Sequence, residues 1–171
     1  MGTLSKLAGK YRSFSLIETR RPVSRSLKYT EIVFCGYGES TYRLVEMEKI
    51  ARTLKSAGAK KIRLNTIGLG NLINGRPIAS ELKYFIDEVS ISLNTTDPVQ
   101  WVQIHRPLPE FRDRGFESVL EFVRQCSKEM PQTYVSAVDS LGFDRDKFEQ
   151  FIKGLGARVK FRPFLNEYES R

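Results

Sequence analysis

Glycine and polar side chains follow the predicted strands, at the points where each strand ends. The first group, Gly36-Tyr37-Gly38-Glu39, comes directly after the apolar run 32–35. Glycine lets the backbone approach a bound molecule closely, and a glycine turn between a strand and a helix is typical of a ligand-facing loop. Since α/β proteins place ligands at the carboxyl ends of their parallel strands, this stretch predicts such a loop.

Three further polar groups follow the next predicted strands. In strand order they are Asn65, Thr66 and Gly68, then Ser92 and Asn94, then Asp139 and Ser140. In a parallel sheet or barrel all of these groups lie at the same end and can converge on one ligand. The alternative is that they are ordinary loop residues that complete turns and helix caps.

Several familiar catalytic patterns are not met. The turn 36–41 lacks the lysine of a P-loop, which would neutralise phosphate charge. Gly68-Leu69-Gly70 follows a strand, but Ile73 occupies the third glycine position of a dinucleotide fingerprint, where close helix packing needs glycine. His105 is the only histidine, and the sequence gives it no catalytic partner. The sequence therefore offers no nucleotide fingerprint and no catalytic triad.

Alternating strand and helix patterns must position these groups. Five short apolar runs predict strands, over 31–35, 61–65, 89–94, 133–138 and 157–161. Apolar stripes at helical spacing predict the helices between them, over 42–57, from about Ile78, from Pro98, over 116–126 and after Asp144. The glycine-rich stretch 66–71 is expected to be a loop and Asn74-Gly75 a turn. The order predicts one α/β domain with a parallel sheet and right-handed crossovers.

Some local features can be assigned within these helices. The first helix is expected to bury one stripe, formed by Leu44, Met47, Ile50, Ala51 and Leu54. Gly58 is expected to end this helix in the left-handed conformation. Asp97 and Asp144 are expected to cap the helices that follow them.

The net charge of +8 is concentrated in residues 1–29, where seven basic side chains face Glu18 alone. A basic, serine-rich stretch is typical of a flexible tail, and it is also typical of a mitochondrial transit peptide. Such a tail can bind nucleic acid through phosphate contacts. We expect residues 30–171 to form the folded domain, which is nearly neutral and shows no interleaving of aromatic and basic residues.

The remaining composition indicates a cytoplasmic protein without a membrane contact. No stretch approaches the roughly 18 apolar residues of a membrane span, and no secretory signal pattern is present. The two cysteines, Cys35 and Cys126, are expected to be buried, reduced thiols. No Cys/His cluster has the spacing of a metal site.

The residues at the strand ends resemble the radical S-adenosylmethionine (SAM) superfamily, most closely its members associated with TatD-type nucleases. The similarity runs in order over about residues 30 to 165, through 32–39, 62–66, 68–76, 89–94, Arg106-Pro107 and Arg162-Pro163-Phe164. It implies a partial radical-SAM-type (β/α) barrel with about five parallel strands, in which the first strand unit of the family is missing.

The resemblance also implies a binding site for SAM. The family's loop for the amino group corresponds to Gly36, Tyr37, Gly38 and Glu39. The groups that would line the ribose and the methionine carboxylate are Asn65, Thr66, Ser92 and Asn94. The backbone of residues 159–161 would meet the adenine.

The sequence departs from the family where the chemistry begins. Radical SAM enzymes hold a [4Fe–4S] cluster in a Cys-x3-Cys-x2-Cys loop after their first strand, and here Cys35 is the only cysteine before Gly36. Ser40 stands where the family has proline, and Ile67 where asparagine is usual. We therefore expect a domain that retains SAM-type binding without radical chemistry. The alternatives are an active enzyme that is split or truncated, with the cluster segment elsewhere, and a non-enzymatic nucleic-acid or protein-binding module that uses the basic tail.

The missing strand unit has a consequence for partners. The strand over 31–35 becomes an unpaired parallel edge, and such edges recruit a second copy of the chain or another protein. Apolar residues of the tail, such as Phe14, Leu16 and Ile17, are an alternative cover for it.

Overall fold

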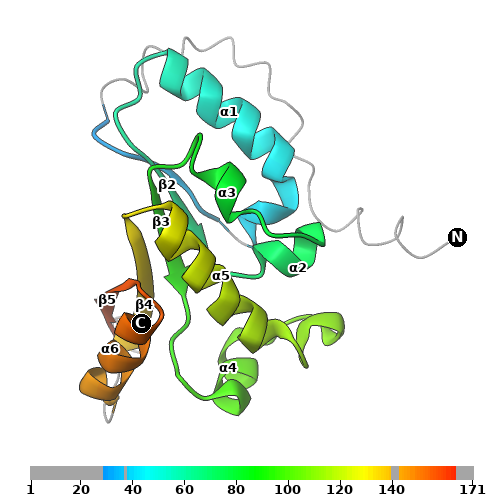
Figure 1. The fold of residues 1–171 in the computed structure, drawn as a ribbon, viewed down its shortest axis with the longest axis vertical. Coiled ribbons are helices and arrows are strands. Elements are labelled where there is room, and N and C mark those ends of the chain that lie inside the picture. The colour runs from blue at the N-terminus through cyan, green and yellow to red at the C-terminus, as the bar shows by residue number, and fades with distance from the viewer. Residues whose placement is uncertain (1–28, 37, 140–142, 165–171) are drawn as a thin grey trace, which may run out of the picture.

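The protein is an α/β unit built on one open parallel sheet (Figure 1). The computed structural model describes residues 29–36, 38–139 and 143–164. The five strands are β1 (Ile32–Phe34), β2 (Ile62–Thr66), β3 (Glu88–Ser92), β4 (Thr133–Asp139) and β5 (Arg158–Pro163). They pair in parallel in the order β1-β2-β3-β4-β5, with β1 and β5 at the edges. The predicted α/β class and the five parallel strands are confirmed, and among the described strands β1 lies at an edge of the sheet as expected.

In the described residues, six α-helices and two 3₁₀ turns connect the strands. They are η2 (Ser40–Arg43), α1 (Leu44–Ser56), α2 (Gly70–Asn74), α3 (Ala79–Leu82), α4 (Pro98–His105), η3 (Pro109–Phe111), α5 (Gly115–Glu129) and α6 (Arg145–Gly154). Asp97 and Asp144 cap α4 and α6 as predicted, because each carboxylate accepts a hydrogen bond from a backbone N–H three residues on. Gly58 has the expected positive φ, at +93°, just beyond α1.

One prediction about the segment after β2 is wrong, since the stretch expected to be a loop contains the start of α2. The helix expected from about Ile78 is present, but it is the single turn α3. A tertiary contact stabilises the short α2, since Asn74 Nδ2 donates to the Thr41 carbonyl at 3.1 Å, and the same amide donates to the Gly70 carbonyl within the helix at 2.8 Å. Gly75, with φ +65°, then ends it as the predicted turn. Local propensity gives no sign of these contacts.

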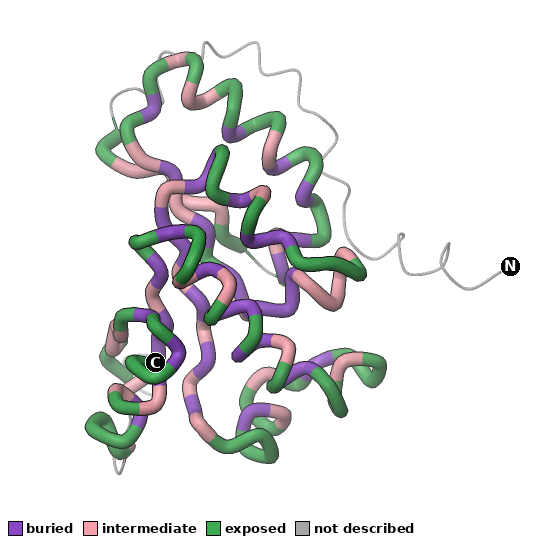
Figure 2. The backbone as a smooth tube through the Cα atoms, in the orientation of Figure 1, coloured by how far each residue is buried: buried purple, intermediate pink, exposed green. Residues whose placement is uncertain are grey.

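All the crossovers step in the same direction along the sheet. Right-handed crossovers of this kind place their helices on one face, and Figure 1 shows α1, α3 and α5 over the same side of the strands. The side chains that point to this face from the central strands are fully buried, as Leu64, Val89, Ile91 and Val135 show, and those of the edge strands are partly buried. Figure 2 shows the matching buried stripes on the helices. The core therefore lies between the sheet and this single layer of helices.

Two predicted buried side chains are exposed instead. Ile50 is 47% exposed, because it lies on the flank of a narrow stripe that Leu44, Met47, Ala51 and Leu54 already fill. Cys35 is exposed at the end of β1, whereas Cys126 is buried on α5. Both thiols are free, and burial raises the pKa of Cys126. Within the described residues, no helix has the length and apolar character needed to cross a membrane.

Candidate functional site

Glu39 joins the glycine turn after β1 to the end of β2. Its Oε1 accepts hydrogen bonds from the backbone N–H and the hydroxyl of Thr41, at 3.1 and 2.8 Å. Its Oε2 accepts from the Thr66 hydroxyl and the Ile67 backbone N–H, both at 2.8 Å. Glu39 is only 9% exposed, so these four donors are what stabilise its buried charge. The carboxylate therefore holds the turn in place.

Thr66 belongs to the same buried cluster and is 5% exposed. Its hydroxyl donates to Glu39 and accepts a hydrogen bond from the Gly68 N–H at 2.9 Å. Glu39 and Thr66, two of the residues predicted for the SAM site, thus use their side chains to connect the first two strand ends. Their role at the site is to position the backbone around them.

The backbone of the glycine turn itself is open. A Cβ placed on Gly36 or on Gly38 would meet no atom within 4 Å. Gly38 has φ +100°, a conformation that side chains disfavour, so the turn requires glycine at this position. Tyr37, the other residue predicted in this turn, lies outside the described residues.

Asn65 and Ser92 lie on the sheet face opposite the helices. Asn65 alternates with the buried Leu64 and Thr66 along β2, and its side chain is exposed. Ser92 is half-buried at the end of β3. It lies two residues after Ser90, on the same face, and Ser90 is the residue that pairs with Asn65. The sheet therefore brings these two predicted polar groups to neighbouring positions on its open face.

Asn94 follows β3 in the left-handed conformation, with φ +64°. Its Oδ1 accepts from the Val138 N–H at 3.1 Å and from Arg162 Nη2 at 3.3 Å, so it connects the ends of β3, β4 and β5. His105 Nε2 lies 3.3 Å from Asn94 Nδ2 and 3.1 Å from the Leu93 carbonyl. These two contacts need opposite tautomers of a neutral imidazole, so His105 makes one at a time.

The environment of His105 favours the neutral ring. Burial lowers its pKa, the hydrogen bond to the Leu93 carbonyl raises it, and the charge of Arg162 lowers it further, with a net downward shift. The ring also stacks on Trp101, with 5.3 Å between centroids. The imidazole is thus packed between Trp101 and Asn94, where it can accept a hydrogen bond from the Asn94 amide.

The glycines at 68 and 70 pack against the core. A Cβ on Gly68 would come within 2.9 Å of Val119, and a Cβ on Gly70 within 2.6 Å of Ile78. Close packing therefore accounts for both glycines. Asp139 makes an ion pair with Arg145, which lowers the carboxyl pKa, and Ser140 lies outside the described residues.

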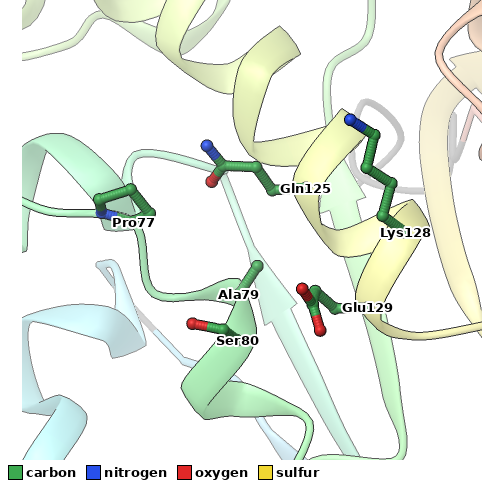
Figure 3. A pocket seen from close by; sticks show the side chains of 6 residues that line it. All are labelled: Pro77, Ala79, Ser80, Gln125, Lys128 and Glu129. Carbon is green, nitrogen blue, oxygen red and sulfur yellow. The ribbon is translucent and has the colours of Figure 1, made fainter.

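A separate pocket of about 200 Å³ lies on the helix side (Figure 3). Residues of α3 and α5 and of the segment before α3 line it: Pro77, Ala79, Ser80, Gln125, Lys128 and Glu129. None of the residues predicted for the site is among them, so the pocket is unrelated to the strand ends.

The sequence-based reading missed a charged cluster on the open face of the sheet. Glu88, whose side chain is 3% exposed, accepts from Lys61 at 2.7 Å and from Lys160 at 2.6 Å. Burial raises the Glu88 pKa, but the two lysine hydrogen bonds outweigh it and hold the pKa below its ordinary value. The alternation of Arg158, Lys160 and Arg162 with apolar residues is the signal that could have placed these cations on one face.

The residues present do not fit a [4Fe–4S] cluster. Such a cluster needs three thiolates beside one another. The chain has two cysteines, of which Cys35 follows β1 and Cys126 lies on α5. No group of three metal-binding side chains occurs in the described ranges either. No model of a known protein family and no curated protein matches the chain.

Proposed function

We propose that this chain is a radical-SAM-like domain that binds SAM at the carboxyl ends of β1, β2 and β3. The observation that carries the proposal is the open edge formed by Gly36, Gly38, Asn65 and Ser92, whose backbone or side chains are free to meet a ligand. Sequential parallel strands with one layer of helices are also what a partial barrel requires, since its ligand face is the one without helices.

The chemistry of the open edge suits the zwitterionic end of SAM. The backbone of the glycine turn is accessible to an ammonium group, and the Asn65 amide can accept from or donate to a ribose hydroxyl. Arg162 has no acidic partner among the described residues, and Asn94 fixes its guanidinium at 3.3 Å. We assign Arg162 as the cation for the methionine carboxylate, because a guanidinium pairs with a carboxylate in two parallel hydrogen bonds.

Calorimetric titration of the full chain with SAM tests the proposal. Asn65→Ala should weaken binding about fivefold or more, because it removes an exposed amide that makes no side-chain hydrogen bond with the described residues. Gln150→Ala is the matched control, since it removes an exposed amide from α6. Asn94→Ala should weaken binding more strongly but also destabilise the β3–β4 connection. Absence of heat from SAM with the folded wild type, or equal affinity of the Asn65 and Gln150 variants, would refute the site.

A second candidate is one component of a split radical SAM enzyme. The edge of β1 favours it, because β1 pairs only with β2 among the described strands and leaves a parallel edge for a strand of another chain. That chain would have to supply the three cluster thiolates. Anaerobic reconstitution of this chain alone with iron and sulfide should yield no [4Fe–4S] spectrum. A stoichiometric cluster on this chain alone would overturn the assignment of the thiolates to another chain.

A further inference from the structure

The open face of the sheet carries an excess of basic side chains. Within the described residues, five cations and two carboxylates occupy it: Lys61, Arg63, Arg158, Lys160, Arg162, Glu31 and Glu88. Glu31 and Glu88 pair with Lys61, Arg63 and Lys160, as the ion pairs show. No carboxylate pairs with Arg158 or with Arg162 in the part of the chain that the structure describes. The unneutralised charge therefore lies along the edge strand β5.

An aromatic ring lies between these cations. Tyr134 on β4 is the register partner of Arg158. Arg158 donates to the Tyr134 hydroxyl at 3.2 Å, and its guanidinium lies 5.7 Å from the ring centroid. Lys160 Nζ lies 3.6 Å from the same centroid and donates a hydrogen bond to Glu88. The prediction that the folded domain has no interleaving of aromatic and basic residues is therefore wrong, because the interleaving occurs across two strands and not along one.

We infer that the β4–β5 half of the open face binds single-stranded RNA. The exposed guanidinium of Arg158, held by the Tyr134 hydroxyl, offers both a phosphate contact and a flat surface on which a base can stack. Arg158 and Arg162 lie four residues apart on one strand, about 13 Å, which is far enough to contact separate phosphates of one strand. Accessible stacking surfaces favour unpaired bases, since the bases of a duplex are already stacked.

The neighbouring polar groups favour RNA over DNA. Ser90 on β3 is the register partner of Tyr134 on one side and of Asn65 on the other. Hydroxyl and amide groups beside a phosphate-binding row can hydrogen-bond a ribose 2′-hydroxyl, which DNA lacks. This surface shares Asn65 and Arg162 with the edge proposed for SAM, whereas Arg158, Tyr134 and Ser90 lie outside that edge, so the inference goes beyond the function proposed above.

Fluorescence anisotropy with the full chain and a labelled oligouridylate of about 12 nucleotides tests the inference. Arg158→Ala should weaken binding about five- to twentyfold and reduce the slope of log K against log salt by about one, measured between about 50 and 200 mM salt. The RNA affinity of Arg158→Lys should lie between that of the wild type and that of Arg158→Ala, because lysine keeps the charge and loses the planar group. Lys160 is not a suitable target, because its removal would leave the buried Glu88 short of a partner.

Arg124→Ala on α5 is the matched control. It removes one exposed arginine from the helix-covered side, so its net charge equals that of the Arg158 variant. Its RNA affinity should match the wild type, and unfolding curves of all variants should coincide. Equal RNA affinity of the Arg124 and Arg158 variants, which is the result if residues 1–29 alone bind RNA, would overturn the inference. The wild type should also be titrated with a DNA oligomer of the same length. Equal affinity of the wild type for the DNA oligomer and the oligouridylate would overturn the assignment to RNA.

Discussion

Replacement of Glu39 by glutamine tests whether this carboxylate holds the first two strand ends together. In the wild type both oxygens accept two hydrogen bonds, and each oxygen has one backbone N–H donor that cannot reorient. Glutamine keeps one oxygen and places an NH₂ group where the other stood. One of the two backbone amides, that of Thr41 or that of Ile67, then faces a donor and loses its acceptor.

The size of the effect follows from this loss. The threonine hydroxyl beside the new NH₂ group, that of Thr41 or that of Thr66, can rotate and accept from it, so this contact survives in reversed form. The unpaired amide and the weaker neutral acceptor together cost about 2–4 kcal/mol, since a hydrogen bond to a charged group contributes about 1.5–3 kcal/mol and an unsatisfied buried amide costs about 1–3 kcal/mol. For a chain of this size, such a loss lowers the Tm by roughly 5–15 °C.

Urea unfolding provides the measurement, because the single tryptophan, Trp101, is fully buried and reports on the transition. Glu110→Gln is the matched control, since it removes one carboxylate charge at an exposed position. A Glu39→Gln variant within about 0.5 kcal/mol of that control would refute the reasoning, because surface substitutions alone stay within this range. It would return Glu39 to the group of side chains available to a ligand.

Three other predictions concern the core, the thiols and the acid response. Gly115→Ala should destabilise the fold by about 1–3 kcal/mol in the same assay, because the new Cβ would lie 2.7 Å from the Trp101 ring, and an unchanged midpoint would contradict that contact. A thiol reagent should modify Cys35 rapidly in the native protein and Cys126 only after unfolding, as mass spectrometry of the labelled peptides can show. Because the Glu88 pKa is lowered in the folded state, its contribution to stability is present above its ordinary pKa and is lost as the pH falls through the lowered value. Glu88→Gln should therefore cost about 1–3 kcal/mol at pH 7 and flatten the loss of stability below about pH 5; equal acid curves would contradict the ion-pair cluster.

The fold could be predicted from the sequence because hydrophobic period and capping residues agree along most of the chain. Each strand run is bounded by turn residues, and Asp97 and Asp144 mark helix starts that the structure confirms. The segment 66–78 could not be predicted in this way, because α2 depends on the Asn74 amide reaching the Thr41 carbonyl from another part of the chain. A five-residue helix has too little periodicity to be recognised alone.

The candidate site was predictable only in its location. Parallel strand order fixes the edge at which Gly38, Asn65, Ser92 and Asn94 meet, and the sequence suffices for that. Which side chains remain available depends on pairing across strands, and there the sequence gives no guide. Glu39 and Thr66 are residue types that often bind ligands, yet their side chains form a hydrogen bond with one another.

The polar open face and the single helix layer have a common physical origin. A parallel sheet covered on both faces has strands that are apolar throughout, whereas β2 and β3 alternate between apolar and polar residues. Such alternation is stable only if the polar face meets water, a ligand or a polar partner, because a polar group buried without a partner costs free energy. Glu88 is an example, since two lysines offset the desolvation of its buried carboxylate. An apolar substitution at an open-face position, such as Ser90→Val, should therefore leave the fold intact and lower solubility, while Ile91→Ser on the helix face should unfold the protein. The difference between these two neighbouring residues follows from which face each occupies, and it is independent of any ligand the chain binds.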